Sequence, residues 1–157
     1  MSIEDFKGLM DGFEPASLLP ELDPILDKFA AILRIVVLIG PVVLLVMGLL
    51  YLFAAPKEAN HYVGYRCYYG MGSVEAWRFT QRLAGIVWSA LGLVLSIAMV
   101  VVSGSFAGMP TMDLLWKAVY CVALEAGLMA VACIAINTAA AVRFDSKGNE
   151  RRKKARR

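Results

Sequence analysis

The stretch IVVLIGPVVLLVMGLLYLFAA, residues 35–55, decides the fold class of this chain. It contains no charged side chain, and it is longer than the roughly 18 apolar residues that are typical of a membrane-spanning helix. Two further long apolar runs follow, at residues 83–102 and 114–142. Gly40 and Pro41 interrupt the first run, which neighbouring helices tolerate inside a membrane. The sequence therefore predicts an all-α membrane protein with three transmembrane helices.

The composition agrees with one membrane domain. Of the 157 residues, 59% are hydrophobic and 18% are charged, whereas soluble domains carry about a quarter charged residues. The three apolar runs leave too little polar chain for a separate soluble domain. We therefore expect a transmembrane domain over residues 29–142, between an acidic segment at 1–28 and a basic tail at 143–157.

Lysine and arginine residues predict the orientation, because they are retained on the cytoplasmic side of a membrane. The 103–113 connection has none. The 56–82 connection has four, namely Lys57, Arg66, Arg78 and Arg82. The tail has eight, namely Arg143, Lys147, Arg151, Arg152, Lys153, Lys154, Arg156 and Arg157. This pattern predicts a cytoplasmic 56–82 connection, a cytoplasmic C-terminus and an N-terminus outside.

Two alternatives stay open for the acidic segment 1–28: a helix lying in the membrane interface or a loosely ordered tail. Pro15, Pro20 and Pro24 exclude one long helix there. The tail ends in RRKKARR, which is basic enough to attract anionic lipid or nucleic acid. We interpret it as a topology anchor, and we expect membrane lipid but no nucleic acid as a partner.

Small residues recur at four-residue spacing in the second and third runs. Such pairs allow helix backbones to approach closely in lipid. The pairs are Gly85 with Ser89, Gly92 with Ser96, Ala126 with Ala130, and Ala135 with Ala139. They predict a packed bundle within the chain, and self-association into a homo-oligomer is the alternative.

The connection PKEANHYVGYRCYYGMGSVEAWRFTQR, residues 56–82, is unusually long, because connections in compact bundles span only a few residues. We expect it to be structured. Ser73 is placed to cap a helix that carries Glu75 in its first turn and continues into the second run. One face of that helix carries Trp77, Gln81, Ala84 and Trp88. An interfacial belt of tyrosine, tryptophan and arginine is the simpler interpretation of the same residues.

The connection also carries a motif that resembles the signature of the SdpI family. Its positions are Asn60, Gly64, Tyr65, Arg66, Ser73, Trp77 and Arg82. SdpI proteins are bacterial membrane proteins named for an immunity protein against a sporulation-delaying peptide toxin. The resemblance extends over about residues 40–105. It implies a multi-pass protein of the bacterial inner membrane, and it makes the motif positions candidate binding residues for a partner.

Glu125 lies about eleven residues into the third run, hence roughly 16 Å deep at 1.5 Å per residue. An acid near the middle of a bilayer is a candidate functional site. We expect it to be either protonated or paired. The expected partners are Arg66 folded inward, a tyrosine hydroxyl or a partner protein, and a protonated acid with a purely structural hydrogen bond is the alternative.

Two functions follow from these observations. The first is immunity to a membrane-active peptide toxin, or signalling through a cytoplasmic regulator, by binding at the connection. The second is a small oligomeric transporter or proton-coupled protein centred on Glu125. An enzyme is not expected, because His61 is the only histidine and no catalytic arrangement is evident. Nor does the spacing of Cys67, Cys121 and Cys133 indicate a metal site or cofactor.

Overall fold

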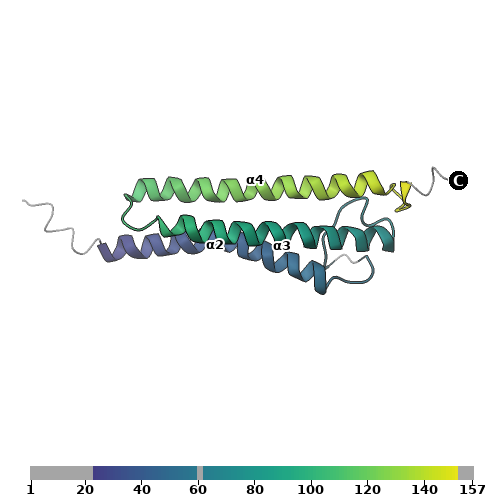
Figure 1. Ribbon diagram of the computed structural model, residues 1–157, viewed down its shortest axis with the longest axis horizontal. Coiled ribbons are helices and arrows are strands. Elements are labelled where there is room, and N and C mark those ends of the chain that lie inside the picture. Colours follow the sequence, from purple (N-terminus) through teal and green to yellow (C-terminus); the bar gives the residue numbers. More distant parts are fainter. Residues whose placement is uncertain (1–22, 60–61, 152–157) are drawn as a thin grey trace, which may run out of the picture.

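The computed structural model describes residues 23–59 and 62–151, and in this part of the chain three long helices lie side by side (Figure 1). They are α2 (Asp23–Phe53), α3 (Val74–Gly104) and α4 (Thr111–Arg143). All three are long and apolar enough to cross a membrane. The predicted all-α, three-span class is therefore confirmed, and the chain is a multi-pass membrane protein. The predictions for residues 1–22, Asn60 and residues 152–157 lie outside the described residues.

Helix α2 begins well before the apolar run that predicted it. It starts at Asp23, and Pro24 lies in its first turn, where proline is tolerated because that turn lacks intrahelical N–H partners. Arg34 is consequently a helix residue inside this span. One face of α2 is buried along its length, at Val37, Pro41, Leu44, Gly48 and Tyr51.

Glycines bring α2 and α3 into close antiparallel contact, as the small-residue spacing of α3 predicted. A Cβ added to Gly92 would lie 2.7 Å from the Leu45 Cα, and one added to Gly48 would lie 2.8 Å from the Ser89 Cα. Real Cβ atoms do not approach so closely, so only glycine permits this separation of the two backbones. The contacts also define the register, in which residues 45 and 92 face each other and residues 48 and 89 face each other.

Helix α4 uses a different face from the one that its small residues predicted. Ala126, Ala130 and Ala135 are exposed, and a Cβ added to Gly127 would meet nothing within 4 Å. The prediction that this stripe packs within the chain is wrong. The inward face instead carries residues spaced four or seven positions apart, at Leu114, Ala118, Glu125, Ala132, Ile136 and Ala140.

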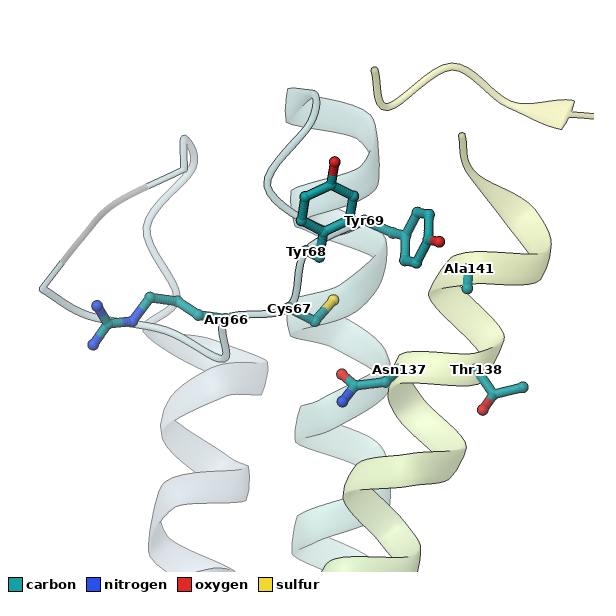
Figure 2. A pocket seen from close by; sticks show the side chains of 7 residues that line it. All are labelled: Arg66, Cys67, Tyr68, Tyr69, Asn137, Thr138 and Ala141. Atoms are coloured by element: carbon teal, nitrogen blue, oxygen red, sulfur yellow. The ribbon is translucent and has the colours of Figure 1, made fainter. Parts of the chain in front are cut away.

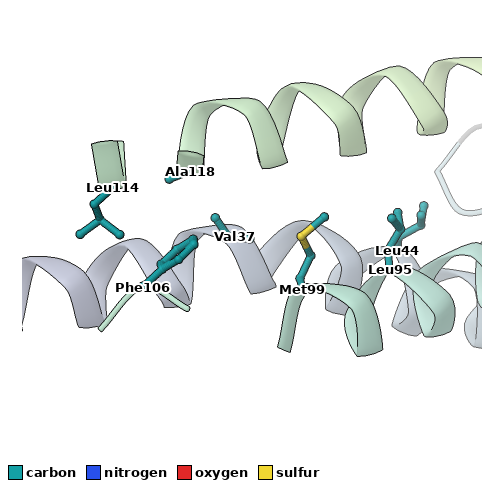
Figure 3. Packing of buried hydrophobic residues seen from close by; sticks show 7 residues of the cluster. All are labelled: Val37, Leu44, Leu95, Met99, Phe106, Leu114 and Ala118. Carbon is teal, nitrogen blue, oxygen red and sulfur yellow. The ribbon is translucent and has the colours of Figure 1, made fainter. Parts of the chain in front are cut away.

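Two hydrophobic clusters hold the bundle together. The larger lies toward the turn between α3 and α4, where Phe106 is 1% exposed and packs with residues of all three helices (Figure 3). The smaller lies at the opposite end and contains Tyr51, Tyr65, Ala84 and Ile136. It lies beside residues 54–73, which we call the connection from here on, because residues 74–82 of the expected 56–82 connection form the first turns of α3. Tyr65 therefore belongs to the core, although it lies outside the helices.

Candidate functional site

The connection is joined to α3 by a backbone-to-side-chain pair. The Tyr65 main-chain N–H donates to Gln81 Oε1 at 2.8 Å, and Gln81 Nε2 donates to the Tyr65 carbonyl oxygen at 2.7 Å. Both bonds are buried, and Gln81 is 2% exposed. Buried main-chain groups need hydrogen-bond partners. The Gln81 amide provides Tyr65 with the one acceptor and one donor that a neighbouring strand would provide in a sheet.

The Tyr65 side chain extends this attachment to the other two helices. Its hydroxyl lies 3.1 Å from Asn137 Oδ1 and 3.3 Å from the Cys133 carbonyl oxygen, both on α4. Its ring meets Trp88 edge-on at 5.4 Å, and Trp88 lies 5.4 Å from Tyr51 of α2. Burial raises the pKa of the Tyr65 hydroxyl, and the neighbouring Cys133 raises it further. The hydroxyl therefore stays neutral and remains a hydrogen-bond donor.

Trp77 holds two points of the connection at once. It is fully buried, and its Nε1 donates to the Pro56 carbonyl oxygen at 2.8 Å. Gly64 packs against its ring with a φ of 117°, and a Cβ there would lie 2.7 Å from two ring carbons. Glycine is favoured at this position for its left-handed backbone and for the space it leaves to the indole.

Ser73 caps α3, as predicted, and also binds the segment that follows α4. Its Oγ accepts from the Ala76 main-chain N–H at 3.1 Å and donates to the Gly148 carbonyl oxygen at 2.8 Å. Gly148 has a φ of 75° and lies directly against the Gly72 backbone. We call residues 144–151 the capping segment, because it covers the first turn of α3.

An aromatic and ionic cluster fastens the capping segment. The Arg143 guanidinium forms a salt bridge with Glu150 at 2.8 Å and stacks over the Phe79 ring at 4.5 Å. Phe144 is 2% exposed and lies 5.6 Å from Phe79. These contacts join the start of α3 to the end of α4, beside the connection.

Two of the predicted motif residues point away from this core. Arg66 and Arg82 are exposed. Tyr62 and Tyr68 beside them are 90% and 74% exposed. This end of the bundle therefore presents cationic and aromatic side chains on a backbone that buried hydrogen bonds attach to α3.

An open pocket of about 540 Å³ lies between the connection and α4 (Figure 2). Its lining residues are Arg66, Cys67, Tyr68, Tyr69, Asn137, Thr138 and Ala141. Figure 2 shows the Arg66 guanidinium directed away from the two tyrosines and from α4. Cys67 Sγ accepts a hydrogen bond from the Gly70 N–H at 3.3 Å. The pocket is thus lined by tyrosine rings, a thiol and the polar side chains of α4, while Arg66 borders it.

Comparison with known proteins bears on this end of the molecule. The model of the SdpI/YfhL protein family matches residues 57–137. The chain belongs to the SdpI/YfhL family. The matched region begins after α2 and reaches into α4, so it extends further toward the C-terminus than the expected 40–105. No curated protein and no solved structure matches the chain.

The SdpI/YfhL match includes every described motif residue, and the structure divides them by environment. Gly64, Tyr65, Ser73 and Trp77 make the internal contacts of the connection, whereas Arg66 and Arg82 face outward. The sequence alone did not mark Gln81 or Gly148 as site residues. Gln81 could have been identified because it shares a helix face with Trp77. Gly148 could have been identified because it ends an Asp-x-x-Gly sequence that is typical of a turn.

Glu125 also lies within the SdpI/YfhL match, and the structure places it apart from the connection. It is 8% exposed near the middle of α4, and a Cβ added to Gly40 would lie 2.7 Å from its Oε2. Its Oε1 is buried and makes no hydrogen bond with any described residue. The expected partnership with Arg66 is wrong. Arg66 lies at the connection, level with Asn137, which is twelve residues or about 18 Å further along α4.

Proposed function

We propose that this SdpI/YfhL-family protein acts by binding a peptide or protein partner at the connection, as an immunity or signalling protein and without catalysis. One observation carries the proposal. The motif residues Gly64, Tyr65 and Trp77 hold the connection from inside, and this leaves Arg66 and Tyr68 presented outward on an ordered backbone. An ordered surface loses less conformational entropy on binding than a flexible one.

The chemistry of this surface indicates the class of partner. Arginine and tyrosine contribute strongly to protein interfaces, because each offers a large contact area with a polar end. The exposed arginines Arg66 and Arg82 suit carboxylates, and the exposed rings of Tyr62 and Tyr68 suit apolar or aromatic side chains. The proposed partner is therefore a segment in which acidic residues alternate with apolar ones, from a membrane-active peptide toxin or a cytoplasmic regulator.

We place the connection and the C-terminus in the cytoplasm of a bacterium, with the protein in its inner membrane and its N-terminus outside. The connection end carries Lys57, Arg66, Arg78 and Arg82, whereas the 105–110 turn at the opposite end has no basic residue. Positively charged ends are retained inside. Reporter fusions at residue 107 and at the C-terminus test this placement. Alkaline phosphatase should be active only at residue 107, and activity only at the C-terminus would reverse the topology.

Survival of a toxin-sensitive bacterium tests the binding function. Cells expressing the wild-type protein, Arg66→Ala or Arg82→Ala at matched membrane abundance are challenged with a panel of membrane-active peptides. Lys117→Ala is the matched control, since it removes a basic residue at the opposite end of the bundle. Protection by the wild type and the control but not by the arginine variants supports the proposal. Equal protection by the wild type and all three variants would show that these exposed arginines are not needed for the function.

A second candidate function, a proton-coupled or transport role centred on Glu125, is favoured by a separate observation. The Glu125 carboxyl is nine-tenths buried in an apolar bundle, and its Oε1 has no partner among the described residues. Three helices enclose little pathway, so this function requires several copies of the chain. Proton flux into vesicles that contain the purified protein, compared with Glu125→Gln, tests it. Equal flux for the two proteins would exclude it.

A further inference from the structure

Buried polar groups gather at one level of the bundle, away from the connection. Ser96 Oγ and Glu125 Oε1 are both buried without a hydrogen-bond partner among the described residues. In the register defined by residues 45 and 92, one further turn of each helix places Ser96 opposite Pro41. Glu125 lies against Gly40, the residue before that proline. Gly40 of α2 and Glu125 of α4 therefore meet here, and Ser96 of α3 lies at the same level without a hydrogen bond to either.

Pro41 adds an acceptor to this cluster. Proline has no main-chain N–H, so the carbonyl of Val37, four residues earlier in α2, loses its intrahelical donor. Val37 and Pro41 are both buried, and no water is available to such a carbonyl in the middle of an apolar bundle. The cluster thus contains a carbonyl that needs a donor and a carboxyl that needs a partner.

The charged and titratable groups around Glu125 supply no bound counter-ion. On α2, Arg34 lies on the same face as Val37, about 9 Å along the axis from Gly40, and its Nε is buried without a partner in the part of the chain that the structure describes. Helix α3 has no charged residue after Arg82. On α4, Cys121 lies one turn away, and Lys117 donates to Ser105 Oγ at 2.7 Å.

Gly40 provides the space for the acid. The distance of 2.7 Å between a Cβ at this position and Glu125 Oε2 excludes any larger residue without a shift of the carboxyl. An ionised carboxylate in this setting is costly, because an apolar bundle excludes water and none of the described side chains pairs with Glu125. A neutral carboxyl, in contrast, has an O–H to donate, and the carbonyl of Val37, three residues before Gly40 on α2, lacks a donor.

We propose that Glu125 is a proton-binding site at neutral pH, whose O–H donates to the Val37 carbonyl freed by Pro41. A proton fits the donor set better than a hard divalent cation, because Ca²⁺ takes about six to eight oxygen ligands. The site offers two carboxyl oxygens and one carbonyl oxygen. Proton loss would leave a charge between α2 and α4, so it would loosen the contact of α4 with its neighbours.

This proton site goes beyond the binding function at the connection. It deepens the second candidate function by naming its ligand, but it does not require transport.

Infrared spectroscopy of the purified protein in lipid nanodiscs tests the proposal through the C=O stretch of a protonated carboxyl. We expect this band at pH 7 in the wild type, and its loss in Glu125→Gln, which keeps the size and a hydrogen-bond donor. Glu75→Gln is the matched control, because Glu75 is an exposed acid in the first turn of α3. It should leave the band unchanged.

The alternative to a protonated Glu125 is an ion pair with Arg34. If Glu125 is ionised and paired with the Arg34 guanidinium, the wild type shows no such band and Arg34→Gln creates it. That result overturns the proposal. A second measurement needs no variant: dicyclohexylcarbodiimide, an apolar reagent for protonated carboxyls, should label the α4 peptide of the wild type at pH 7. Failure to label it, while a protonated membrane carboxyl in a reference protein is labelled, also overturns the proposal.

Different results would contradict the proton site and the transport function. Both measurements above detect a bound proton without a gradient. If the carboxyl band is present but no proton flux is measured, the proton site is supported and the transport function is excluded. If both the band and the label are absent, the proton site is excluded, whatever the flux.

Discussion

The main chain of Tyr65 and the side-chain amide of Gln81 exchange two hydrogen bonds, at 2.8 and 2.7 Å, across sixteen residues of sequence. The pair joins the connection to α3 at the level where Tyr65 also reaches α4. It explains how a segment without helix or strand forms part of the core. Four predictions follow from this attachment and its neighbours.

Gln81→Met should lower the free energy of unfolding strongly. Methionine fills the space of the glutamine but leaves the Tyr65 N–H and carbonyl buried without hydrogen-bond partners. Each unsatisfied group costs about 1–3 kcal/mol. Denaturation in mixed micelles measures the change in the free energy of unfolding. Arg82→Met, one residue further and exposed, is the control and should stay within about 0.5 kcal/mol of the wild type. Equal effects of the two substitutions would contradict the assigned role of Gln81.

Gly64→Ala should destabilise by more than about 1 kcal/mol, because alanine disfavours a φ of 117° and its Cβ would meet the Trp77 ring. Gly127→Ala provides the comparison. Its Cβ would enter open space in a helix, where alanine gains about 1 kcal/mol in propensity. Thermal unfolding in the same detergent compares the two variants. A stabilised Gly64→Ala would show that the connection adopts a different backbone.

Ser73→Ala should cost about 1 kcal/mol through the lost N-cap and should also free the capping segment, whose Gly148 carbonyl loses its donor. Limited proteolysis followed by mass spectrometry detects the second effect as faster cleavage within residues 144–151. Ser89→Ala removes a hydroxyl that donates within its own helix, to the Ile86 carbonyl, and cleavage should then stay at the wild-type rate. Unchanged cleavage in Ser73→Ala would contradict the contact between Ser73 and Gly148.

Tyr65 should make the stability of the protein fall at alkaline pH. Its pKa is raised in the folded state by burial, so the folded protein keeps a proton that the unfolded chain releases above the ordinary tyrosine value of about 10. The stabilisation is fully present below that pH and is lost as the pH rises further. Unfolding free energies from pH 8 to pH 11 should decline less steeply in Tyr65→Phe. Parallel slopes would show that another group titrates.

Local features of the sequence accounted for much of the architecture. The three spans were predictable because long, mainly apolar runs match both the thickness and the low polarity of a bilayer. Ser73 and Glu75 marked the start of α3, since capping depends on residues only three positions apart. Gly85 and Gly92 indicated close packing of α3 correctly, but the same spacing on α4 was misleading. In a membrane, small residues on a lipid-facing surface have the same spacing as those in an interface.

Residues within a turn or two of one another were enough to predict the three spans, the N-cap of α3 and the motif of the connection. The contacts of Gln81 with Tyr65, of Gly148 with Ser73 and of Glu125 with Gly40 became apparent only in the folded chain. Each of these contacts joins residues far apart in the chain. They depend on the rotation and register of whole helices, which are set by close packing at glycines rather than by hydropathy.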